Sequence, residues 1–127
     1  MSKTTITLTL TAILLAAAPA MAQNAVCIEP APPTMVDGNT VNHDQLVAAI
    51  AQVKDFMAKS DLYQQCVAED LEAKKAAAAK ANMPFDPQLQ QVALAKAAAN
   101  QQVKDKMAAD INAQSGIYKQ RVATTGK

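Results

Sequence analysis

Apolar residues recur at alternating spacings of four and three between residues 46 and 71, the repeat of an amphipathic helix with one narrow seam. The expected seam consists of Leu46, Ile50, Val53, Met57, Ser60, Gln64, Val67 and Leu71, and a second edge carries Phe56 and Tyr63. Asn42 followed by Gln45 has the pattern of a capping box, so we predict a helix over about 43–82. The polar pair Ser60-Asp61 leaves open whether this helix is continuous, kinked or followed by a second start.

A second helix is predicted over about 87–120. Pro84 cannot continue a helix interior, and Asp86 followed by Pro87 is a favourable cap and first-turn pair. The expected seam contains Leu89, Val92, Lys96, Ala99, Val103, Met107, Ile111, Ser115 and Tyr118. Gly116 weakens the last turns by about 1 kcal/mol relative to Ala, and residues 123–127 are expected to fray.

The segment before the first helix, residues 23–41, is predicted to be an extended arm. Three prolines in the run 29–33 remove backbone donors, which favours a polyproline-like conformation, and Asp37-Gly38 marks a turn. A proline-rich ligand for a partner domain is the alternative interpretation of this segment. A short connection between two long helices favours an antiparallel pair. The predicted fold is therefore all-α, with the arm tied to a helical hairpin over residues 42–122.

The start of the chain has the pattern of a cleavable secretory signal peptide. Lys3 precedes an apolar stretch from Ile6 to Ala18, which is shorter than the roughly 20 residues that a membrane-spanning helix needs. The small-x-small run 20–22 predicts cleavage between Ala22 and Gln23, so residues 1–22 would be removed. An uncleaved anchor and a buried core helix are the alternatives. We expect a periplasmic or secreted protein with no membrane span after cleavage, and no lipid anchor, because Cys27 lies downstream of the cleavage site.

The composition of the remaining chain argues against nucleic-acid binding and against a deep core. Loss of Lys3 leaves 11 basic and 11 acidic residues, so no excess of positive charge favours a phosphate backbone. Alanine is abundant, whereas the only aromatic residues are two Phe and two Tyr. Alanine favours helix formation but removes little apolar surface from water. We therefore expect the hairpin to gain stability from the arm, from self-association or from an envelope protein partner.

The two cysteines, Cys27 and Cys66, are expected to form a disulfide in an oxidising compartment. A metal site would need further Cys or His ligands, and the only histidine is His43. Redox-active pairs are usually separated by two residues, unlike this pair. An intermolecular bridge remains the main alternative.

No catalytic constellation is apparent. His43 stands at a helix start without a neighbouring nucleophile, so a solvated first-turn residue is the favoured interpretation. Glu69, Asp70 and Glu72 form an acidic cluster, but Asp70 and Lys74 have the spacing of a surface ion pair. The three glycines outside the signal segment are too dispersed to form a phosphate-binding loop. We expect a non-catalytic protein with no cofactor and no metal ion.

Short motifs resemble a loosely defined group of uncharacterised exported proteins of alphaproteobacteria. The matching segments are Cys27-Ile28-Glu29-Pro30, Asp37-Gly38, residues 60–66 ending in Tyr63-x-x-Cys66, Asn100-Gln101 and Ile117-Tyr118-Lys119. The resemblance implies a periplasmic location and supports the Cys27–Cys66 bridge, with Tyr63 packed beside it. It implies no catalytic or ligand-binding residue.

Two functional hypotheses follow. The first is an envelope or periplasmic interaction or structural module that presents an elongated helical surface to itself or to a partner. The second is a small chaperone or stress-response protein that shields unfolded clients, since Met35, Met57, Met83 and Met107 could supply adaptable apolar contacts. Ordinary core packing of Met57 and Met107 is the competing interpretation.

Overall fold

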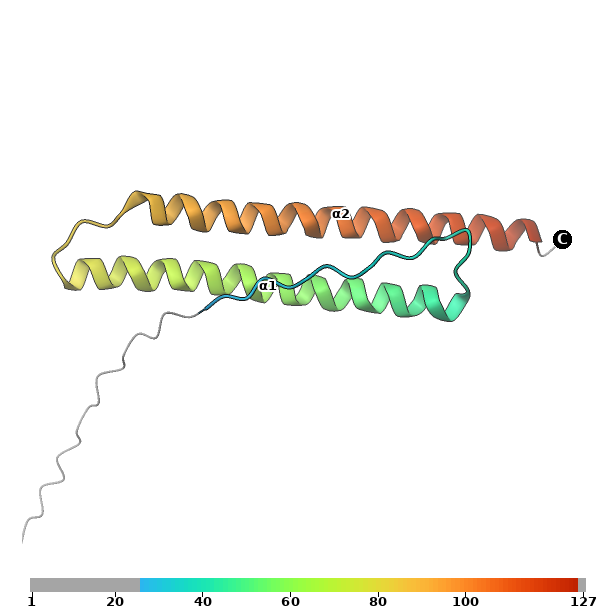
Figure 1. Ribbon diagram of the computed structural model, residues 1–127, viewed down its shortest axis with the longest axis horizontal. Helices are drawn as coiled ribbons and strands as arrows, with labels where there is room; N and C mark the ends of the chain where they lie inside the picture. The colour runs from blue at the N-terminus through green and yellow to red at the C-terminus, as the bar shows by residue number, and fades with distance from the viewer. Residues whose placement is uncertain (1–25, 126–127) are drawn as a thin grey trace, which may run out of the picture.

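The computed structural model describes residues 26–125, which form an extended arm followed by two long antiparallel helices (Figure 1). Helix α1 spans His43–Lys80 and helix α2 spans Pro87–Thr125, and this part of the chain contains no strand. The predicted all-α fold, with an arm tied by a disulfide to a helical hairpin, is confirmed. The predicted signal peptide (1–22), the Ala22–Gln23 cleavage site and residues 126–127 lie outside the described residues.

Local sequence signals determine both ends of α1. The Asn42 side chain accepts a hydrogen bond from the Gln45 backbone amide at 2.8 Å, and the Gln45 side chain accepts one from the Asn42 amide at 3.0 Å. This reciprocal capping box is the predicted one. At the other end, Asn82 has a positive φ of 51°, and the Met83 amide donates to the Ala78 carbonyl, as in a Schellman motif. Between these ends α1 is continuous through Ser60-Asp61.

Helix α2 begins as predicted but extends further than predicted. The Asp86 carboxylate accepts a hydrogen bond from the Gln88 amide at 2.9 Å, immediately before Pro87 in the first turn. The prediction that the helix ends near residue 120 and frays from 123 is wrong for the described residues, since α2 continues to Thr125. The hydroxyls of Thr124 and Thr125 both donate to the Arg121 carbonyl in the preceding turn.

The buried face of α1 is covered from two sides. Its buried residues are Leu46, Ala49, Val53, Phe56, Ser60, Tyr63 and Val67. Phe56 and Tyr63, predicted at a second edge, are only 2% and 5% exposed, whereas the seam residues Ile50 and Met57 are partly buried. The buried stripe is displaced from the predicted seam because the arm covers α1 beside the surface that α2 covers.

On α2 the residues predicted for the seam are buried in the C-terminal part of the helix but exposed in its N-terminal part. Met107 and Ile111 are buried in the core cluster, and Val103 and Tyr118 pack against it. The remaining buried residues are Asn100 and Lys104, whereas the predicted positions Lys96 and Ala99 are exposed.

A layer of polar side chains lies at the middle of the helix interface. The Gln64 amide donates to the Asn100 side-chain oxygen at 2.9 Å, and the Asn100 amide donates to the Ser60 hydroxyl at 3.4 Å. Ser60 and Asn100 are 0% and 1% exposed. Next to them, the Lys104 ammonium forms an ion pair with Asp61. Because a buried amide is costly without its partner, this layer favours one register of the two helices.

The arm runs antiparallel to α1, from the disulfide in the middle of the helix to the end of the hairpin opposite the α1–α2 connection (Figure 1). The predicted turn at Asp37-Gly38 is present, with the Val41 amide donating to the Asp37 carbonyl at 2.9 Å. Three hydrogen bonds attach this end of the arm to α2. The Gly38 amide donates to the Gln114 side chain at 2.7 Å, and the Arg121 guanidinium donates to the Gly38 and Val41 carbonyls.

Candidate functional site

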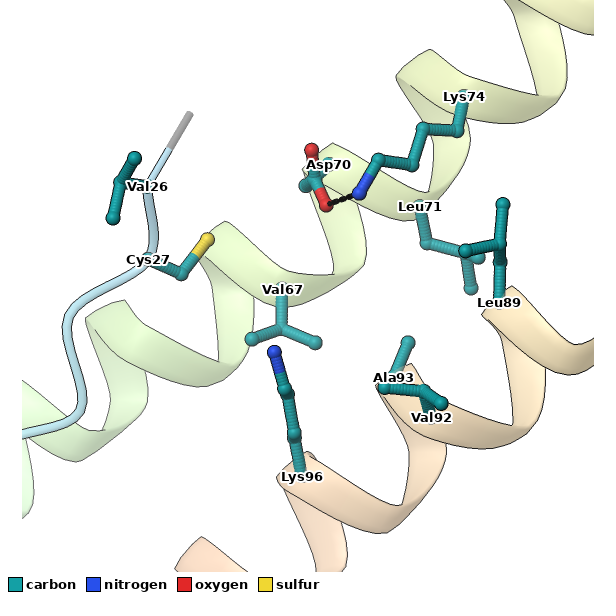
Figure 2. A pocket seen from close by; sticks show the side chains of 10 residues that line it. All are labelled: Val26, Cys27, Val67, Asp70, Leu71, Lys74, Leu89, Val92, Ala93 and Lys96. Atoms are coloured by element: carbon teal, nitrogen blue, oxygen red, sulfur yellow. Dashed lines mark hydrogen bonds and ion pairs between the residues drawn. The ribbon is translucent and has the colours of Figure 1, made fainter. Parts of the chain in front are cut away.

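The groove between α1 and α2 is open on the side from which the arm approaches, in the part of the hairpin nearest the α1–α2 connection (Figure 2). We call this hollow of about 230 Å³ the open groove. Its residues are Val26 and Cys27 of the arm, Val67, Asp70, Leu71 and Lys74 of α1, and Leu89, Val92, Ala93 and Lys96 of α2.

The α1 wall continues the buried stripe of that helix. Val67 is buried and Leu71, one turn later, is partly buried, so the wall becomes more exposed as α1 passes the end of the arm. Asp70 and Lys74 form the predicted i, i+4 ion pair at 2.6 Å at the rim. This pair neutralises both charges on the α1 side of the opening.

The α2 wall presents apolar side chains that no described residue covers fully. Leu89 is 39% exposed and Val92 is 52% exposed, although both belong to the seam predicted from the sequence. Lys96 extends from the same wall toward Val67 across the groove (Figure 2). Within residues 26–125, no carboxylate forms an ion pair with the Lys96 ammonium.

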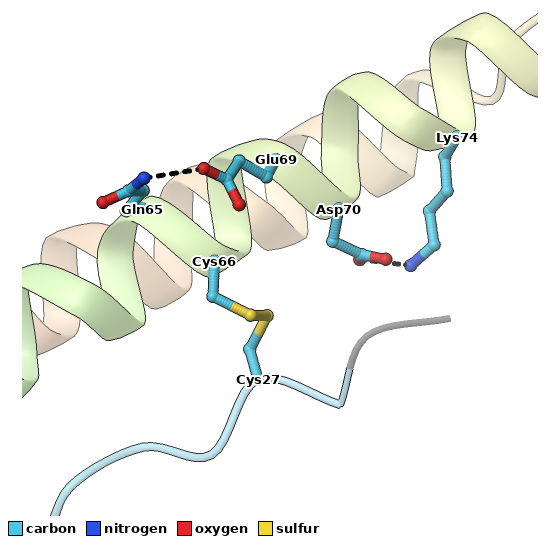
Figure 3. Close-up of a disulfide and its surroundings, with 6 residues drawn as sticks. All are labelled: Cys27, Gln65, Cys66, Glu69, Asp70 and Lys74. Atoms are coloured by element: carbon cyan, nitrogen blue, oxygen red, sulfur yellow. Dashed lines mark hydrogen bonds and ion pairs between the residues drawn. A yellow bond between two sulfur atoms is a disulfide. The ribbon is translucent and has the colours of Figure 1, made fainter. Parts of the chain in front are cut away.

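The predicted disulfide between Cys27 and Cys66 is present (Figure 3), and Cys27 also lines the open groove. The two Cα atoms lie 5.7 Å apart, and the bridge ties the arm to α1 at the point where the open groove begins. On the outer face of α1 nearby, the Gln65 amide donates to Glu69 at 2.7 Å. Among the described residues, only Val26 of the arm therefore lies beyond the bridge, at the open groove.

Tyr63 lies one turn before the bridge and lines a depression together with Cys27 and Cys66. Burial raises the pKa of the Tyr63 phenol above its ordinary value, and the nearby Glu29 carboxylate raises it further. The phenol is therefore neutral at physiological pH and serves as a packing residue under the arm.

The titratable residues considered from the sequence do not come together in one site. His43 is exposed at the start of α1, with its Nδ1 atom 3.3 Å from Asp44. In the acidic cluster, each carboxylate binds a neighbour on its own helix: Gln65 for Glu69, Lys74 for Asp70 and Lys75 for Glu72. No group of three or more His, Cys, Asp or Glu residues among those described could hold a metal ion.

Sequence reasoning did not identify the open groove, although the signals for it were present. The α2 seam begins at Leu89, and the α1 seam runs to Leu71. The Cys27–Cys66 bridge fixes the arm to α1 five residues before Leu71. Taken together, these three features indicate apolar walls on both helices beyond the bridge.

No helix in residues 26–125 is long and apolar enough to cross a membrane. Comparison of the chain with protein-family models, with curated proteins and with solved structures gives no match.

Proposed function

We propose that this chain is an exported, non-catalytic interaction module of the bacterial envelope, and that the open groove is its binding surface. The observation that carries the proposal is the exposure of Leu89 and Val92, whose equivalents further along α2, Val103 and Met107, pack against the core beside the arm. Exposed apolar side chains that gather in one hollow indicate an interaction site more often than isolated ones do.

Export is part of the same proposal. The N-terminal pattern of residues 1–22 supports transport out of the cytoplasm, and the Cys27–Cys66 disulfide is compatible with an oxidising compartment. The three- and four-residue spacing of the buried positions on α1 also supports coiled-coil packing of the hairpin. Mass spectrometry of the protein recovered from the periplasm tests export. A mature chain that begins at Gln23 is expected, and retention of residues 1–22 would contradict this part of the proposal.

A photo-reactive residue at position 92 tests the binding surface. The variant carrying it in place of Val92 is expressed with its own N-terminal segment and irradiated in intact cells, and the same residue in place of Leu94 is the matched control. Leu94 is 60% exposed on the same helix but does not line the open groove. We expect discrete adducts from position 92 and none from position 94. Equal patterns from both positions, or no adduct from either, would refute the assignment of the groove as a binding surface.

A chaperone function is the second candidate, and the same surface would have to support it. Met107 is buried and Met35 and Met57 pack against the core, which leaves Met83 as the exposed member of the four methionines. Client binding would therefore depend on the open groove rather than on a methionine surface. Suppression of aggregation of a denatured model protein by the wild type, and its loss in Val92→Asp but not in Leu94→Asp, is the expected result if the protein is a chaperone.

A further inference from the structure

We infer that the arm is a redox-controlled strap on α1. Reduction of the Cys27–Cys66 bridge by a dithiol frees the part of the arm before the turn at Asp37-Gly38 and uncovers Tyr63, while the hairpin stays folded. This inference goes beyond the proposed function and does not depend on the open groove. It rests on how the two ends of the arm are held and on the side chain that lies beneath it.

The arm faces α1 along one narrow edge. Most of the partly buried positions between residues 27 and 36 are three residues apart, and the positions between them are exposed. The partly buried residues are Cys27, Pro30, Pro33, Met35 and Val36. This spacing matches the three residues per turn of a polyproline helix, which has no internal hydrogen bonds. The arm therefore contributes only a thin stripe of contacts to its own attachment.

The attachments of the arm lie at its two ends. The turn at Gly38 is hydrogen-bonded to α2, and the disulfide joins the other end to α1. Between these ends, residues 28–36 form no hydrogen bond and no ion pair within the part of the chain that the structure describes. Met35 and Val36, beside the turn, pack against the core cluster. Residues 28–34 therefore depend on the bridge more than any other part of the arm.

Tyr63 is the buried side chain of α1 that lies beneath this part of the arm. It is 5% exposed, yet it does not belong to the core cluster that the two helices form together. It lines a hollow with Cys27 and Pro30, and the Glu29 carboxylate is close enough to raise the pKa of its phenol. Phe56, by contrast, belongs to the core cluster, which includes side chains of α2. Loss of the arm should therefore expose Tyr63 far more than Phe56.

Release of the arm needs only thiol–disulfide exchange. A thiolate of the dithiol attacks one sulfur of the bridge, so that the S–S bond breaks, a mixed disulfide forms and the other sulfur leaves as a thiolate that takes up a proton. The second thiol of the reductant then displaces the remaining protein sulfur. Two electrons and two protons thus pass to Cys27 and Cys66, and the reductant becomes a disulfide. Both cysteines are partly exposed beside a surface hollow, so a reductant can reach the bridge.

The hairpin does not need residues 28–34 for its own packing. The core cluster contains none of these residues, and the polar layer joins Ser60 and Gln64 of α1 directly to Asn100 of α2. The hydrogen bonds of the turn to α2 are also independent of the bridge. A segment with no hydrogen bonds and few buried contacts opens at a much lower free energy than the whole fold. Reduction should therefore act locally.

Acetylation of tyrosine by N-acetylimidazole, followed by peptide mass spectrometry, measures the release. The full chain is expressed with its N-terminal segment and purified in the oxidised form. We expect dithiothreitol to raise the acetylation rate of Tyr63 several-fold and to leave the rate of Tyr118, which packs against the core cluster, unchanged. Far-ultraviolet circular dichroism and the hydrogen-exchange protection of residues 103–111 should be the same with and without the reductant.

The matched control is the double variant Cys27→Ser with Cys66→Ser, in which Tyr63 should react rapidly with or without dithiothreitol. A response of this variant to the reductant would overturn the inference, because the reductant would then act elsewhere than on the bridge. Continued protection of Tyr63 in the reduced wild type, whether by the arm or by a second copy, would also overturn it. Loss of the helical signal on reduction would do the same, since the bridge would then stabilise the whole fold.

Discussion

Replacement of Gly38 by alanine tests how the arm is attached to the hairpin. An added Cβ would lie 2.3 Å from the Gln114 carbonyl oxygen and 2.9 Å from the Ile117 Cβ. Both atoms belong to the rigid backbone region of α2, so they cannot move aside as the end of a flexible side chain could. Gly38 has no positive φ, and the requirement for glycine comes from close approach alone.

The turn must therefore move away from α2, and its hydrogen bonds weaken with it. The bonds concerned join the Gly38 amide to Gln114 and the Arg121 guanidinium to the Gly38 and Val41 carbonyls. Val41, now 5% exposed, would also lose part of its burial. Overpacking and the loss of several hydrogen bonds together predict a decrease of about 2–4 kcal/mol in the free energy of unfolding.

Gly116 provides a matched control with the opposite sign. It lies inside α2, and an added Cβ would meet no atom within 4 Å. Gly116→Ala should therefore raise the free energy of unfolding by about 0.5–1 kcal/mol through helix propensity. The same chemical change is thus expected to destabilise the protein at position 38 and to stabilise it at position 116.

Urea unfolding of the oxidised protein, followed by far-ultraviolet circular dichroism, measures both effects. Hydrogen exchange adds a local measurement, since the amides of residues 114–121 should lose protection in Gly38→Ala. A change of less than about 0.5 kcal/mol in Gly38→Ala would refute the reasoning, because it would mean that the contact between the turn and α2 contributes little.

Three further changes should have measurable effects on stability. Replacement of both Cys27 and Cys66 by serine should lower the free energy of unfolding by about 4 kcal/mol, because the bridge closes a loop with a sequence separation of 39. Asn100→Ala should cost about 1–3 kcal/mol in urea unfolding, since it removes the hydrogen-bond partner of the buried Ser60 hydroxyl and one of the two acceptors of the Gln64 amide. Burial, assisted by a nearby carboxylate, raises the pKa of the Tyr63 phenol, so stability should fall as the pH rises from about 10 through this raised pKa.

Control measurements distinguish these specific effects from nonspecific destabilisation of the fold. Reduction of the wild type should reproduce the stability of the double serine variant, and a difference above about 1 kcal/mol would contradict the entropic account. Gln102→Ala, at an exposed position of α2, should change stability by less than about 0.5 kcal/mol. The sign for the phenol follows from proton binding: the folded state holds the proton to higher pH than the unfolded state. Tyr63→Phe should remove the alkaline fall, and an absorbance titration of the phenol that shows no raised pKa would refute the assignment.

Features that depend on a few neighbouring residues were predictable from the sequence. The capping box of Asn42 and Gln45 and the start of α2 at Asp86-Pro87 are local hydrogen-bond patterns, so their residue types suffice to predict them. The predicted end of α2 was wrong: the helix continues to Thr125, and the hydroxyls of Thr124 and Thr125 donate to the Arg121 carbonyl within it.

The candidate site likewise combines features that are visible in the sequence with features that depend on the folded structure. The apolar character of Leu89 and Val92 is visible in the sequence, but their exposure is not, because it depends on which described residues reach them in space. The sequence likewise did not predict that Asn100 is the hydrogen-bond partner of Ser60 and Gln64, since Asn100 faces them only in the register that the folded hairpin adopts.

The sequence by itself determined the all-α class, the two helices and the extended proline-rich arm, because backbone propensity and capping act locally. It favoured the pairing of Cys27 with Cys66 over an intermolecular bridge, and the structure contains that pairing. Only the tertiary structure decided which stripe of each helix is covered. Burial depends on two neighbours at once, and among the described residues the arm lies along the hairpin from Val26 to Val41. The same periodic pattern therefore forms a core beside the arm and an open groove beyond it.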